Sequence, residues 1–397
     1  MLLTLAQVGA AMLDDLQQAP YRPFFLLAGA AALAGGLLWW WPWGSPLLLH
    51  LHLLLFGMAS AAMAGYLLTA LPSWTGWQDC PPVLLWALVG LWCLDRIVVL
   101  LPEPPLFILL TPGLAFHGLL TLFLLRRLWQ ARIWRPVWLA LAPLGPGMAE
   151  CWLLLNWHNT GWIGDAGEWA ALFLALLLIL VGGRAVPAFT RTGLQHLGHP
   201  DRIIAPDWLQ RLSVGLMGIV LLMQGLGWPA HWTGSLLLAT GLLQMLRWVG
   251  WTPWRIGRAP ALWMLHAAWL WLATGLALLG LTRLGWLDLP PGTVLHALTM
   301  GAIGGMCLGI MLRAAMKRTP RGLQPSILQL LAAALVLLSP LPRLLPAPWF
   351  ESGLVTNSLL LAATLWSAGW LLYLMALWPA LRGPVPRPVL SGPRSTA

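Results

Sequence analysis

Long runs of apolar residues constrain the fold of this chain more than any other feature. About twelve runs are each close to the roughly 20 residues that a helix needs to cross a bilayer. They cover residues 23–41, 46–71, 83–101, 106–128, 136–157, 168–190, 208–227, 230–250, 261–282, 292–316, 324–345 and 353–379. Of the 397 residues 59% are hydrophobic and only 9% charged, a balance that excludes a water-soluble chain of this length. The runs are too long for barrel strands, so we predict an all-α, polytopic membrane protein with a single transmembrane domain over residues 1–397.

The formal net charge of +10 suggests a nucleic-acid binder at first sight, but the basic residues lie between the apolar runs. Four arginines follow the fourth run, and Lys317 and Arg318 follow the tenth. The odd-numbered connections instead carry acids such as Glu103, Asp165 and Asp288. By the positive-inside rule, we expect both termini and the even-numbered connections to face the cytoplasm. The expected partner is therefore the lipid bilayer of an inner membrane, and no nucleic acid is expected.

Histidines within the apolar runs are the first candidates for a functional site. An ionisable or metal-binding side chain is costly in lipid and usually needs a partner there. The second, fifth and tenth runs carry histidines near their outer ends, and the ninth carries one about a turn inside its cytoplasmic end. The candidate metal ligands are His50, His52, His158, His266 and His296. His117, near the middle of the fourth run, has no role that the sequence assigns.

Two of these histidines best meet the requirements of a haem b. That cofactor needs one or two neutral imidazoles directed into an apolar slot between helices. His52 and His296 are each followed five residues later by a glycine, and small residues let helices or a flat macrocycle approach closely. His50 points about 200° away from His52 on a regular helix, so we do not expect both to serve one metal. His50 is either part of a different site or a polar anchor at the interface. His266 is a further candidate for cofactor binding.

Acids and arginines inside the runs are the candidates for proton and anion handling. Glu150 in the fifth run and Asp95 in the third are the candidate catalytic residues, as groups of a proton relay or cation site. Asp95 adjoins Arg96, and the two side chains can also satisfy different neighbours. Arg184 and Arg191 in the sixth run are candidates for binding haem propionates or anionic substrates, because guanidinium groups match carboxylates. Both arginines serve equally well as topology anchors.

Five segments spread along nearly the whole chain together resemble the NnrS family. They are Tyr21–Phe25, His50–Gly57, Ala64–Gly76, Gly182–Arg191 and His296–Gly305. The resemblance implies a bacterial inner-membrane protein with haem and copper, linked to nitric oxide metabolism, denitrification and nitrosative stress. Two positions depart from the family's pattern, since Leu53 stands where the family usually has Glu and Arg318 where it usually has His. A member without these residues is expected to bind fewer metals or to lack one step of the chemistry.

A weak internal repeat adds a fold-level expectation. Gly183 precedes Arg191 by the same interval as Gly305 precedes Arg313 in the tenth run. Twelve helices would then form three units of four. That arrangement is similar to the haem–copper oxidases, a likeness of fold and not of function.

The residues and the resemblance together favour a membrane haem protein that binds nitric oxide and reduces it to nitrous oxide. Such an oxidoreductase would take electrons from a quinol or a periplasmic cytochrome, and it would need protons near the histidines. The alternative is a transporter or handling protein for haem or copper without redox turnover, which broken helices around Pro112 and Pro187 favour. A third alternative is a structural partner of a nitrogen-oxide enzyme.

Overall fold

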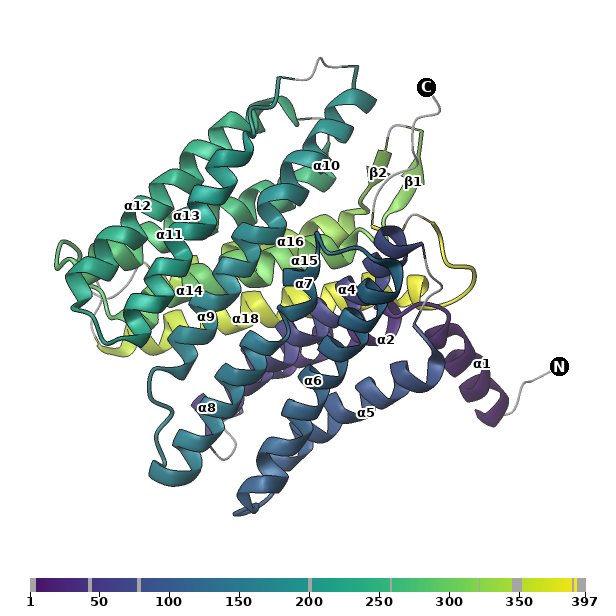
Figure 1. The fold of residues 1–397 in the computed structure, drawn as a ribbon, viewed down its shortest axis with the longest axis horizontal. Helices are drawn as coiled ribbons and strands as arrows, with labels where there is room; N and C mark the ends of the chain where they lie inside the picture. The colour runs from purple at the N-terminus through teal and green to yellow at the C-terminus, as the bar shows by residue number, and fades with distance from the viewer. Residues whose placement is uncertain are drawn as a thin grey trace. The chain divides into compact units, whose positions relative to one another are not determined.

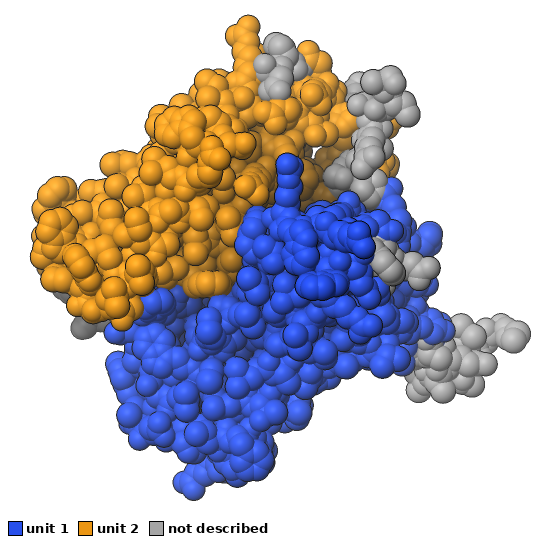
Figure 2. All heavy atoms as spheres, viewed as in Figure 1, with its two compact units in different colours: residues 1–170, 374–389 blue, residues 171–373, 390–397 orange. Residues whose placement is uncertain are grey.

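Helices form most of the described part of the chain, as the computed structural model in Figure 1 shows. The structure describes residues 5–41, 45–76, 80–198, 202–257, 259–320, 322–344, 352–387 and 389–390. The chain divides into two compact units, coloured separately in Figure 2. Unit 1 comprises residues 1–170 and 374–389, and unit 2 comprises residues 171–373 and 390–397. The prediction of a single domain stays a prediction.

Unit 1 is built from helices that pack around α2 and α6. Its elements are α1 (Leu5–Gln17), α2 (Tyr21–Leu37), α3 (Pro46–Leu51), η1 (His52–Met58), α4 (Ala59–Thr75), α5 (Pro82–Val98), α6 (Leu106–Ala131), α7 (Val137–Leu141), α8 (Leu144–Thr160), the start of α9 (Ala166–Leu177) and η5 (Trp378–Leu381). Helix α2 packs against η1 and α4, while α6 packs against α5 and α8. Arg22 is fully buried and donates to the Gly383 carbonyl at 2.6 Å, which ties α2 to the C-terminal segment of this unit.

Unit 2 contains the remaining helices and one small hairpin. Its elements are the end of α9, η2 (Leu178–Gly182), α10 (Gly183–His196), α11 (Asp207–Gly225), α12 (Ala230–Gly250), η3 (Pro253–Arg255), α13 (Pro260–Arg283), α14 (Pro291–His296), η4 (Ala297–Gly304), α15 (Gly305–Leu312), β1 (Lys317–Thr319), β2 (Gly322–Gln324), α16 (Ile327–Leu338), α17 (Leu341–Leu344) and most of α18 (Ser352–Leu377). Strands β1 and β2 are antiparallel, with Arg318 opposite Leu323. The sequence did not predict this hairpin, which contains one of the two departures from the family's pattern.

Each of the twelve apolar runs overlaps a helix, so the prediction of an all-α polytopic membrane protein is confirmed. Within the described part of the chain, 8 helical stretches are long and apolar enough to cross a membrane. They are Pro46–Thr75, Leu106–Ala131, Val137–Thr160, Ala166–His196, Pro260–Arg283, Pro291–Leu312, Ile327–Leu344 and Asn357–Leu381. The other four runs coincide with α2, α5, α11 and α12, which are shorter or less apolar. Residue 345, the end of the eleventh run, lies outside the described residues. The count of twelve spans and the cytoplasmic termini stay predictions.

Three of these stretches contain a π-helical segment where the sequence has glycine. Segments η1, η2 and η4 carry or adjoin Gly57, Gly182 and Gly301. A π-helix places its hydrogen bonds one residue further along than an α-helix, which widens the turn and leaves carbonyl groups open to other donors. Such segments recur at functional sites. The motifs that carry the family resemblance therefore coincide with local departures from α-helical geometry.

Glycine also allows a close helix contact in unit 2, between α12 and α13. A Cβ atom added to Gly241 would lie 2.6 Å from the backbone nitrogen of Ala277. One added to Gly280 would lie 2.6 Å from the backbone nitrogen of Leu238. Neither distance leaves room for a side chain, so the two backbones touch directly. This is the small-residue packing expected where the hydrophobic effect cannot drive helices together.

We expect Gly241→Ala to lower the thermal unfolding midpoint of the purified protein in detergent. The added methyl group meets backbone and not a flexible side chain, and overpacking of this kind typically costs about 1–3 kcal/mol. The matched control is Gly215→Ala in α11, where the added atom has no neighbour within 4 Å. Alanine is the better helix former there, so this variant should keep or slightly raise the midpoint. Equal midpoints for the two variants would contradict the packing argument.

Candidate functional site

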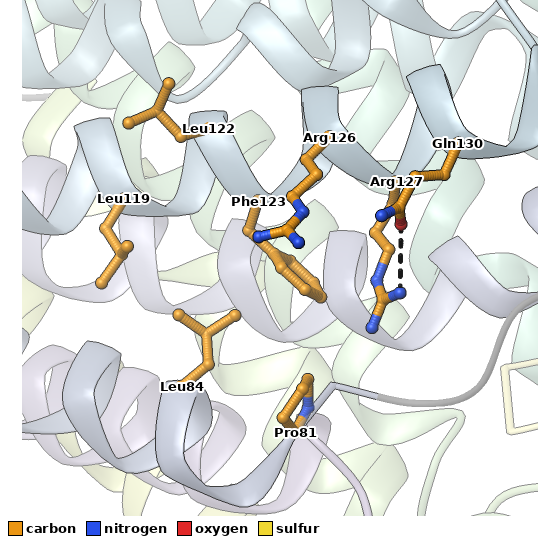
Figure 3. Close-up of a pocket in the computed structure, with 8 residues that line it drawn as sticks. All are labelled: Pro81, Leu84, Leu119, Leu122, Phe123, Arg126, Arg127 and Gln130. Carbon is orange, nitrogen blue, oxygen red and sulfur yellow. Dashed lines mark hydrogen bonds between the residues drawn. The ribbon is translucent and has the colours of Figure 1, made fainter.

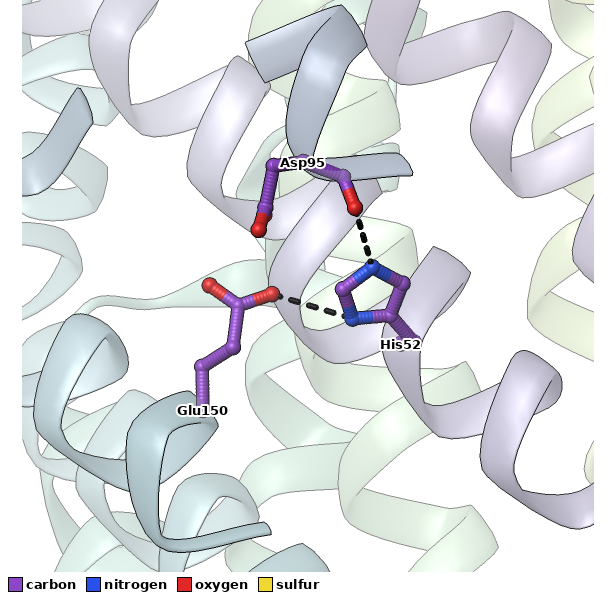
Figure 4. Close-up of side chains that lie close together, drawn as sticks. All are labelled: His52, Asp95 and Glu150. Atoms are coloured by element: carbon purple, nitrogen blue, oxygen red, sulfur yellow. Dashed lines mark hydrogen bonds and ion pairs between the residues drawn. The ribbon is translucent and has the colours of Figure 1, made fainter. Parts of the chain in front are cut away.

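Four elements of unit 1 bring ionisable side chains together away from solvent. They are His52 of η1, Asp95 of α5, His117 of α6 and Glu150 of α8, each no more than 2% exposed. Figure 4 shows His52, Asp95 and Glu150 pointing toward one another. We refer to these four residues, together with Arg96, as the unit 1 cluster. Buried ionisable groups in a membrane protein are functional candidates because each must be compensated.

One face of α5 fixes the cluster against the π-helical segment η1. Trp92, Asp95 and Arg96 stand at positions i, i+3 and i+4, so their side chains lie on the same side of the helix. Trp92 Nε1 donates to the Gly57 carbonyl at 3.1 Å. Arg96 Nη1 donates to the His52 carbonyl at 2.7 Å. Donors of α5 thus satisfy carbonyl groups near both ends of η1, which the widened turn leaves available.

Arg96 lies between the two carboxylates of the cluster. Its Nη2 atom donates to Asp95 Oδ2 and, at 2.6 Å, to Glu150 Oε1. The Arg96 side chain is 9% exposed, so little water screens these ion pairs. Two buried carboxylates without a cation would repel each other and would both lack solvation. Arg96 therefore makes the close approach of Asp95 and Glu150 possible.

His52 makes one contact, between its Nδ1 atom and Glu150 Oε1, that a neutral imidazole cannot satisfy. His52 Nε2 lies 3.1 Å from the backbone carbonyl of Asp95, and a carbonyl can only accept, so Nε2 carries the proton. In a neutral imidazole Nδ1 then has a lone pair, yet it lies 3.1 Å from Glu150 Oε1, which is also an acceptor. Two lone pairs facing each other at this distance require a proton or a metal cation between them.

Two further carboxylate oxygens of the cluster also lack a donor. Asp95 Oδ1 and Glu150 Oε2 are buried and make no hydrogen bond. His117 Nε2 lies 3.6 Å from Glu150 Oε2, beyond hydrogen-bond distance. A Cβ atom added to Gly113 of α6 would lie 3.0 Å from Asp95 Oδ1 and 3.1 Å from Glu150 Oε2. Because Gly113 has no side chain, a small space remains beside it, and both oxygens border this space.

The cluster can hold a metal ion by its distances and by its charge. His52, Asp95 and Glu150 each offer one ligand atom, and these atoms lie within 4.8 Å of one another. With both histidines neutral, the two carboxylates and Arg96 leave a net charge of −1. A monovalent ion such as Cu⁺ would neutralise this charge, and a divalent ion would leave a net charge of +1. The donors are nitrogen and oxygen, which suit iron, copper, zinc or manganese. A proton on His52 would neutralise the cluster equally well.

Unit 2 contains the buried guanidinium of Arg247, which has only neutral partners among those the structure gives. Pro187 in α10 has no N–H group and cannot bond the carbonyl four residues before it, that of Gly183. Arg247 of α12 supplies the missing donor, with Nη2 at 2.9 Å from that carbonyl. Arg247 also bonds the side-chain oxygens of Gln210 and Gln244. This network stabilises the junction of η2 and α10.

His266 lies beside this network in unit 2. It is 3% exposed, and its Nε2 atom lies 2.8 Å from the hydroxyl of Thr190. Because Thr190 donates its own proton to the Val186 carbonyl at 2.7 Å, the hydroxyl accepts from His266. His266 Nδ1 is buried and has no hydrogen-bond partner. A lone pair of His266 is therefore available to a ligand, although no carboxylate accompanies it in the groups described.

The remaining candidates from the sequence lie apart from the unit 1 cluster or in unit 2. His50 accepts a hydrogen bond from Trp39 Nε1 at 3.0 Å, so it has different surroundings from His52. His158 is exposed at the end of α8. His296 Nδ1 lies 2.7 Å from the Gly292 carbonyl, Arg184 is exposed and Arg191 is partly buried.

Sequence reasoning missed the parts played by His117 and Arg247. Glycine and proline positions carried a signal for both. A proline four residues after Gly183 indicates a carbonyl in need of a donor. Gly147 faces His117, whose Cβ would lie 2.9 Å from a Cβ added to the glycine. This contact shows that α6 and α8 approach each other closely at Gly147. The sequence gives the glycine, but only the fold shows that His117 is its neighbour.

The comparisons with known proteins agree with the pattern of motifs. The family model described as NnrS protein matches residues 15–384, which include every residue of the unit 1 cluster and most of unit 2. No curated protein matches the sequence.

We expect Arg96→Met to destabilise the protein strongly. It removes the only cationic side chain bonded to Asp95 and Glu150 in the described cluster and leaves two buried carboxylates facing each other. Removing one partner of a buried ion pair typically costs about 3–5 kcal/mol. The thermal unfolding midpoint in detergent, or the yield of monodisperse protein where the variant fails to fold, measures the loss.

The control is the triple variant Arg96→Met, Asp95→Asn, Glu150→Gln, which removes all three charges together. A neutral network of similar volume avoids the uncompensated charge, so this variant should recover much of the lost stability. A triple variant no more stable than Arg96→Met would argue that Arg96 acts through packing and not through charge.

Proposed function

The chain belongs to the NnrS family, and from this membership we propose that it is a bacterial inner-membrane protein of the nitric oxide response that binds a metal ion in unit 1. The family links the chain to nitric oxide response and to metal binding. One observation carries the proposal, the contact of 3.1 Å between His52 Nδ1 and Glu150 Oε1. Both atoms are acceptors, and a metal ion bound by both would remove their repulsion.

Three protein ligands would hold the ion, namely His52, Asp95 and Glu150. The buried oxygens Asp95 Oδ1 and Glu150 Oε2, which lack donors, support a metal over a single proton. One proton on His52 would satisfy the imidazole contact and leave both oxygens unsatisfied. Among ions that accept nitrogen and oxygen ligands, iron and copper also bind nitric oxide. We therefore propose iron or copper, with nitric oxide as the ligand of the loaded site.

A macrocycle fits the surroundings of His52 less well than an ion does. Both ring nitrogens already contact protein acceptors, at 3.1 Å each. The space beside Gly57, which the sequence left open for a flat group, is taken by the Arg96 guanidinium, 3.1 Å from an added Cβ. We assign no haem to His52. For haem b the better candidate is His296 in unit 2, because its Nδ1 bonds a backbone carbonyl, as haem-ligating histidines commonly do.

The unit 1 cluster also suits the proton requirement of nitric oxide reduction. Joining two molecules of nitric oxide to give nitrous oxide and water consumes two electrons and two protons. Asp95, Glu150, His52 and His117 lie close together and can each accept and release protons, with His52 Nδ1 at 3.1 Å and His117 Nε2 at 3.6 Å from the Glu150 carboxylate. We propose that Glu150 and Asp95 deliver these protons, and that a quinol or a periplasmic cytochrome supplies the electrons. In this proposal each carboxylate takes up a proton before it delivers one, and Arg96 holds the two side chains in place.

The second candidate function is transport or handling of a metal or haem. Its support is the three π-helical segments and the prolines inside α6 and α10, Pro112 and Pro187. Interrupted helices near the middle of a membrane protein commonly mark the binding site of a transporter. A transporter would release its cargo, whereas a reductase or a nitric oxide receptor would retain the metal during purification.

We expect the wild-type protein to bind about one copper or ferrous ion per chain, and His52→Ala and Glu150→Gln to bind much less. Protein stripped by a chelator is loaded anaerobically, desalted and analysed for metal by mass spectrometry. Nitric oxide is then added to the reduced samples and their spectra are recorded. The matched control is His50→Ala, which removes a histidine two residues away that bonds Trp39 instead. It should retain both the metal and the spectral change.

A pyridine haemochrome assay on the same samples separates a bound haem from a single ion. If the His52→Ala protein kept its full metal content, His52 would not be a metal ligand. The contact between His52 and Glu150 would then be explained by a proton. Rapid loss of metal from the wild type on desalting would favour the transport alternative.

We expect Gly113→Ala to weaken metal binding about tenfold or more while the protein still folds. The added methyl group occupies the space between Asp95 Oδ1 and Glu150 Oε2, and changes around metal ligands commonly cost about 10–100-fold in affinity. Gly118→Ala on the same helix adds the same methyl group where no atom lies within 4 Å. Competition titration with a chelator of known affinity measures both variants. Equal affinities would exclude the Gly113 space as part of the site.

A further inference from the structure

Trp92 of α5 contacts both the backbone of η1 and the guanidinium of Arg96, although it offers no ligand to a metal. Its Nε1 atom donates to the Gly57 carbonyl at 3.1 Å, and the guanidinium carbon of Arg96 lies 5.5 Å from the centre of its ring. The side chain is buried. Figure 3 shows the surface cavity of about 410 Å³ that the start of α5 and α6 border, and Trp92 does not line it. The contacts of Trp92 are thus with its protein neighbours and not with a ligand in that cavity.

The spacing of the two α5 donors matches a π-helical turn in η1. Trp92 and Arg96 stand one helical turn apart, and they donate to the carbonyls of Gly57 and His52, which are positions i+5 and i of η1. In an α-helix, positions i and i+5 lie roughly 140° apart around the helix axis. A π-helix closes its hydrogen bonds between residues five apart and so brings these two positions to the same side. The two donors therefore fit the widened turn and not a regular α-helix.

The register of η1 sets the direction of the His52 side chain. Removing the extra residue of a widened turn rotates one side of the helix by about 100° relative to the other. Helix α4, which follows η1, packs against α2 and α6, whereas α3 before η1 has only 6 residues. A return to α-helical geometry would therefore turn the His52 end and not α4. His52 Nδ1 would then lose its contact of 3.1 Å with Glu150 Oε1.

The ring of Trp92 also restricts the position of Arg96. Arg96 bonds the carboxylates of both Asp95 and Glu150, so a shift of its guanidinium would disturb both ion pairs. An aromatic face attracts a guanidinium, and more strongly where little water reaches the pair. A Cβ atom added to Gly57 would lie 3.1 Å from Arg96 Nη1, which shows how closely the guanidinium approaches η1. Trp92 thus acts on the unit 1 cluster in two ways, through its N–H group and through its ring.

We propose that Trp92 is a positioning residue for the metal site of unit 1. Its indole N–H holds η1 in the π-helical register that directs His52 to Glu150, and its ring holds the guanidinium that pairs with the two carboxylates. This role rests on the proposed function, since the site it serves is the proposed metal site. The effect of Trp92 on η1 exists with or without a metal, so the two proposals can fail separately.

The first test is a competition titration with Cu²⁺ as the probe, on the full-length protein in detergent. Trp92→Phe keeps an aromatic face for Arg96 and removes only the N–H donor. We expect it to weaken Cu²⁺ binding by about tenfold or more, as the loss of groups that orient metal ligands commonly does. The electron paramagnetic resonance spectrum of bound Cu²⁺ should lose its coupling to an imidazole nitrogen.

A pair of further variants separates the donor from the ring. The amide nitrogen of glutamine is the same number of bonds from Cα as the indole nitrogen of tryptophan, so Trp92→Gln can still donate to the Gly57 carbonyl. Trp92→Leu has neither a donor nor an aromatic ring. We therefore expect Trp92→Gln to bind Cu²⁺ more tightly than Trp92→Leu. Equal affinities for these two variants would contradict the role of the N–H donor.

The matched control is Trp271→Phe in α13 of unit 2. Trp271 Nε1 also donates to a backbone carbonyl, that of Leu337, at 2.9 Å. The control loses a hydrogen bond of the same kind in the other unit, so it should keep the wild-type affinity for Cu²⁺ even where its thermal unfolding midpoint falls. Wild-type affinity in Trp92→Phe, or an equal loss of affinity in Trp271→Phe, would overturn the proposal.

Hydrogen exchange of the metal-free protein tests the effect on η1 by itself. The backbone amides of His52–Met58 should exchange faster in Trp92→Phe than in the wild type, because the turn is no longer held at Gly57. The same segment should exchange at the wild-type rate in Trp271→Phe. If the wild type bound no Cu²⁺, the proposed metal site would fail, and faster exchange would still assign the positioning of η1 to Trp92. Unchanged exchange in Trp92→Phe would overturn the proposal whatever the metal content.

Discussion

The ionisable cluster of unit 1 depends on one cation, the guanidinium of Arg96, placed between two carboxylates where almost no water reaches. Without it, Asp95 and Glu150 could not both be ionised and buried at this distance. The same guanidinium bonds the His52 carbonyl at 2.7 Å and so connects the charges to the π-helical segment η1. Arg96 therefore has two functions at once. It compensates the charges of Asp95 and Glu150, and it donates to a carbonyl group that the π-helical turn leaves open at His52.

Glycine gives this cluster its space. In membrane helices small residues usually allow backbones to touch, and Gly241 in α12 is an instance of that use. Gly57, Gly113 and Gly147 serve a different purpose, since the atoms that approach them belong to Arg96, to Asp95 and Glu150, and to His117 respectively. A side chain at any of these positions would collide with a charged or titratable group. Glycine at these positions leaves the volume in which the polar groups meet.

The sequence alone predicted the class of fold well, because the length and apolarity of a membrane helix are local properties. It also singled out His52, Asp95 and Glu150 separately, since each breaks an apolar run. It could not predict that they meet, because η1, α5 and α8 are far apart in the chain and nothing in their spacing encodes which helices are neighbours. The π-helical segments were equally hidden, since an α-helix and a π-helix bury the same residue types. His117 remained without a role because its neighbouring helices could not be predicted. Arg247 remained without one for that reason and because the π-helical segment next to its partner carbonyl was hidden.

The two units use a buried guanidinium in opposite electrostatic senses. Arg96 and Arg247 each satisfy a backbone carbonyl next to a π-helical segment, at 2.7 and 2.9 Å. Arg96 does so beside two carboxylates, which leaves its surroundings with one negative charge in excess. Arg247 does so among glutamines and lies over the rings of Trp251 and Trp269, which leaves its positive charge without a carboxylate among the contacts described. A cation therefore gains most in unit 1. The same backbone task, satisfying a carbonyl beside a π-helical segment, is thus performed in an acidic setting in unit 1 and in a neutral, aromatic setting in unit 2.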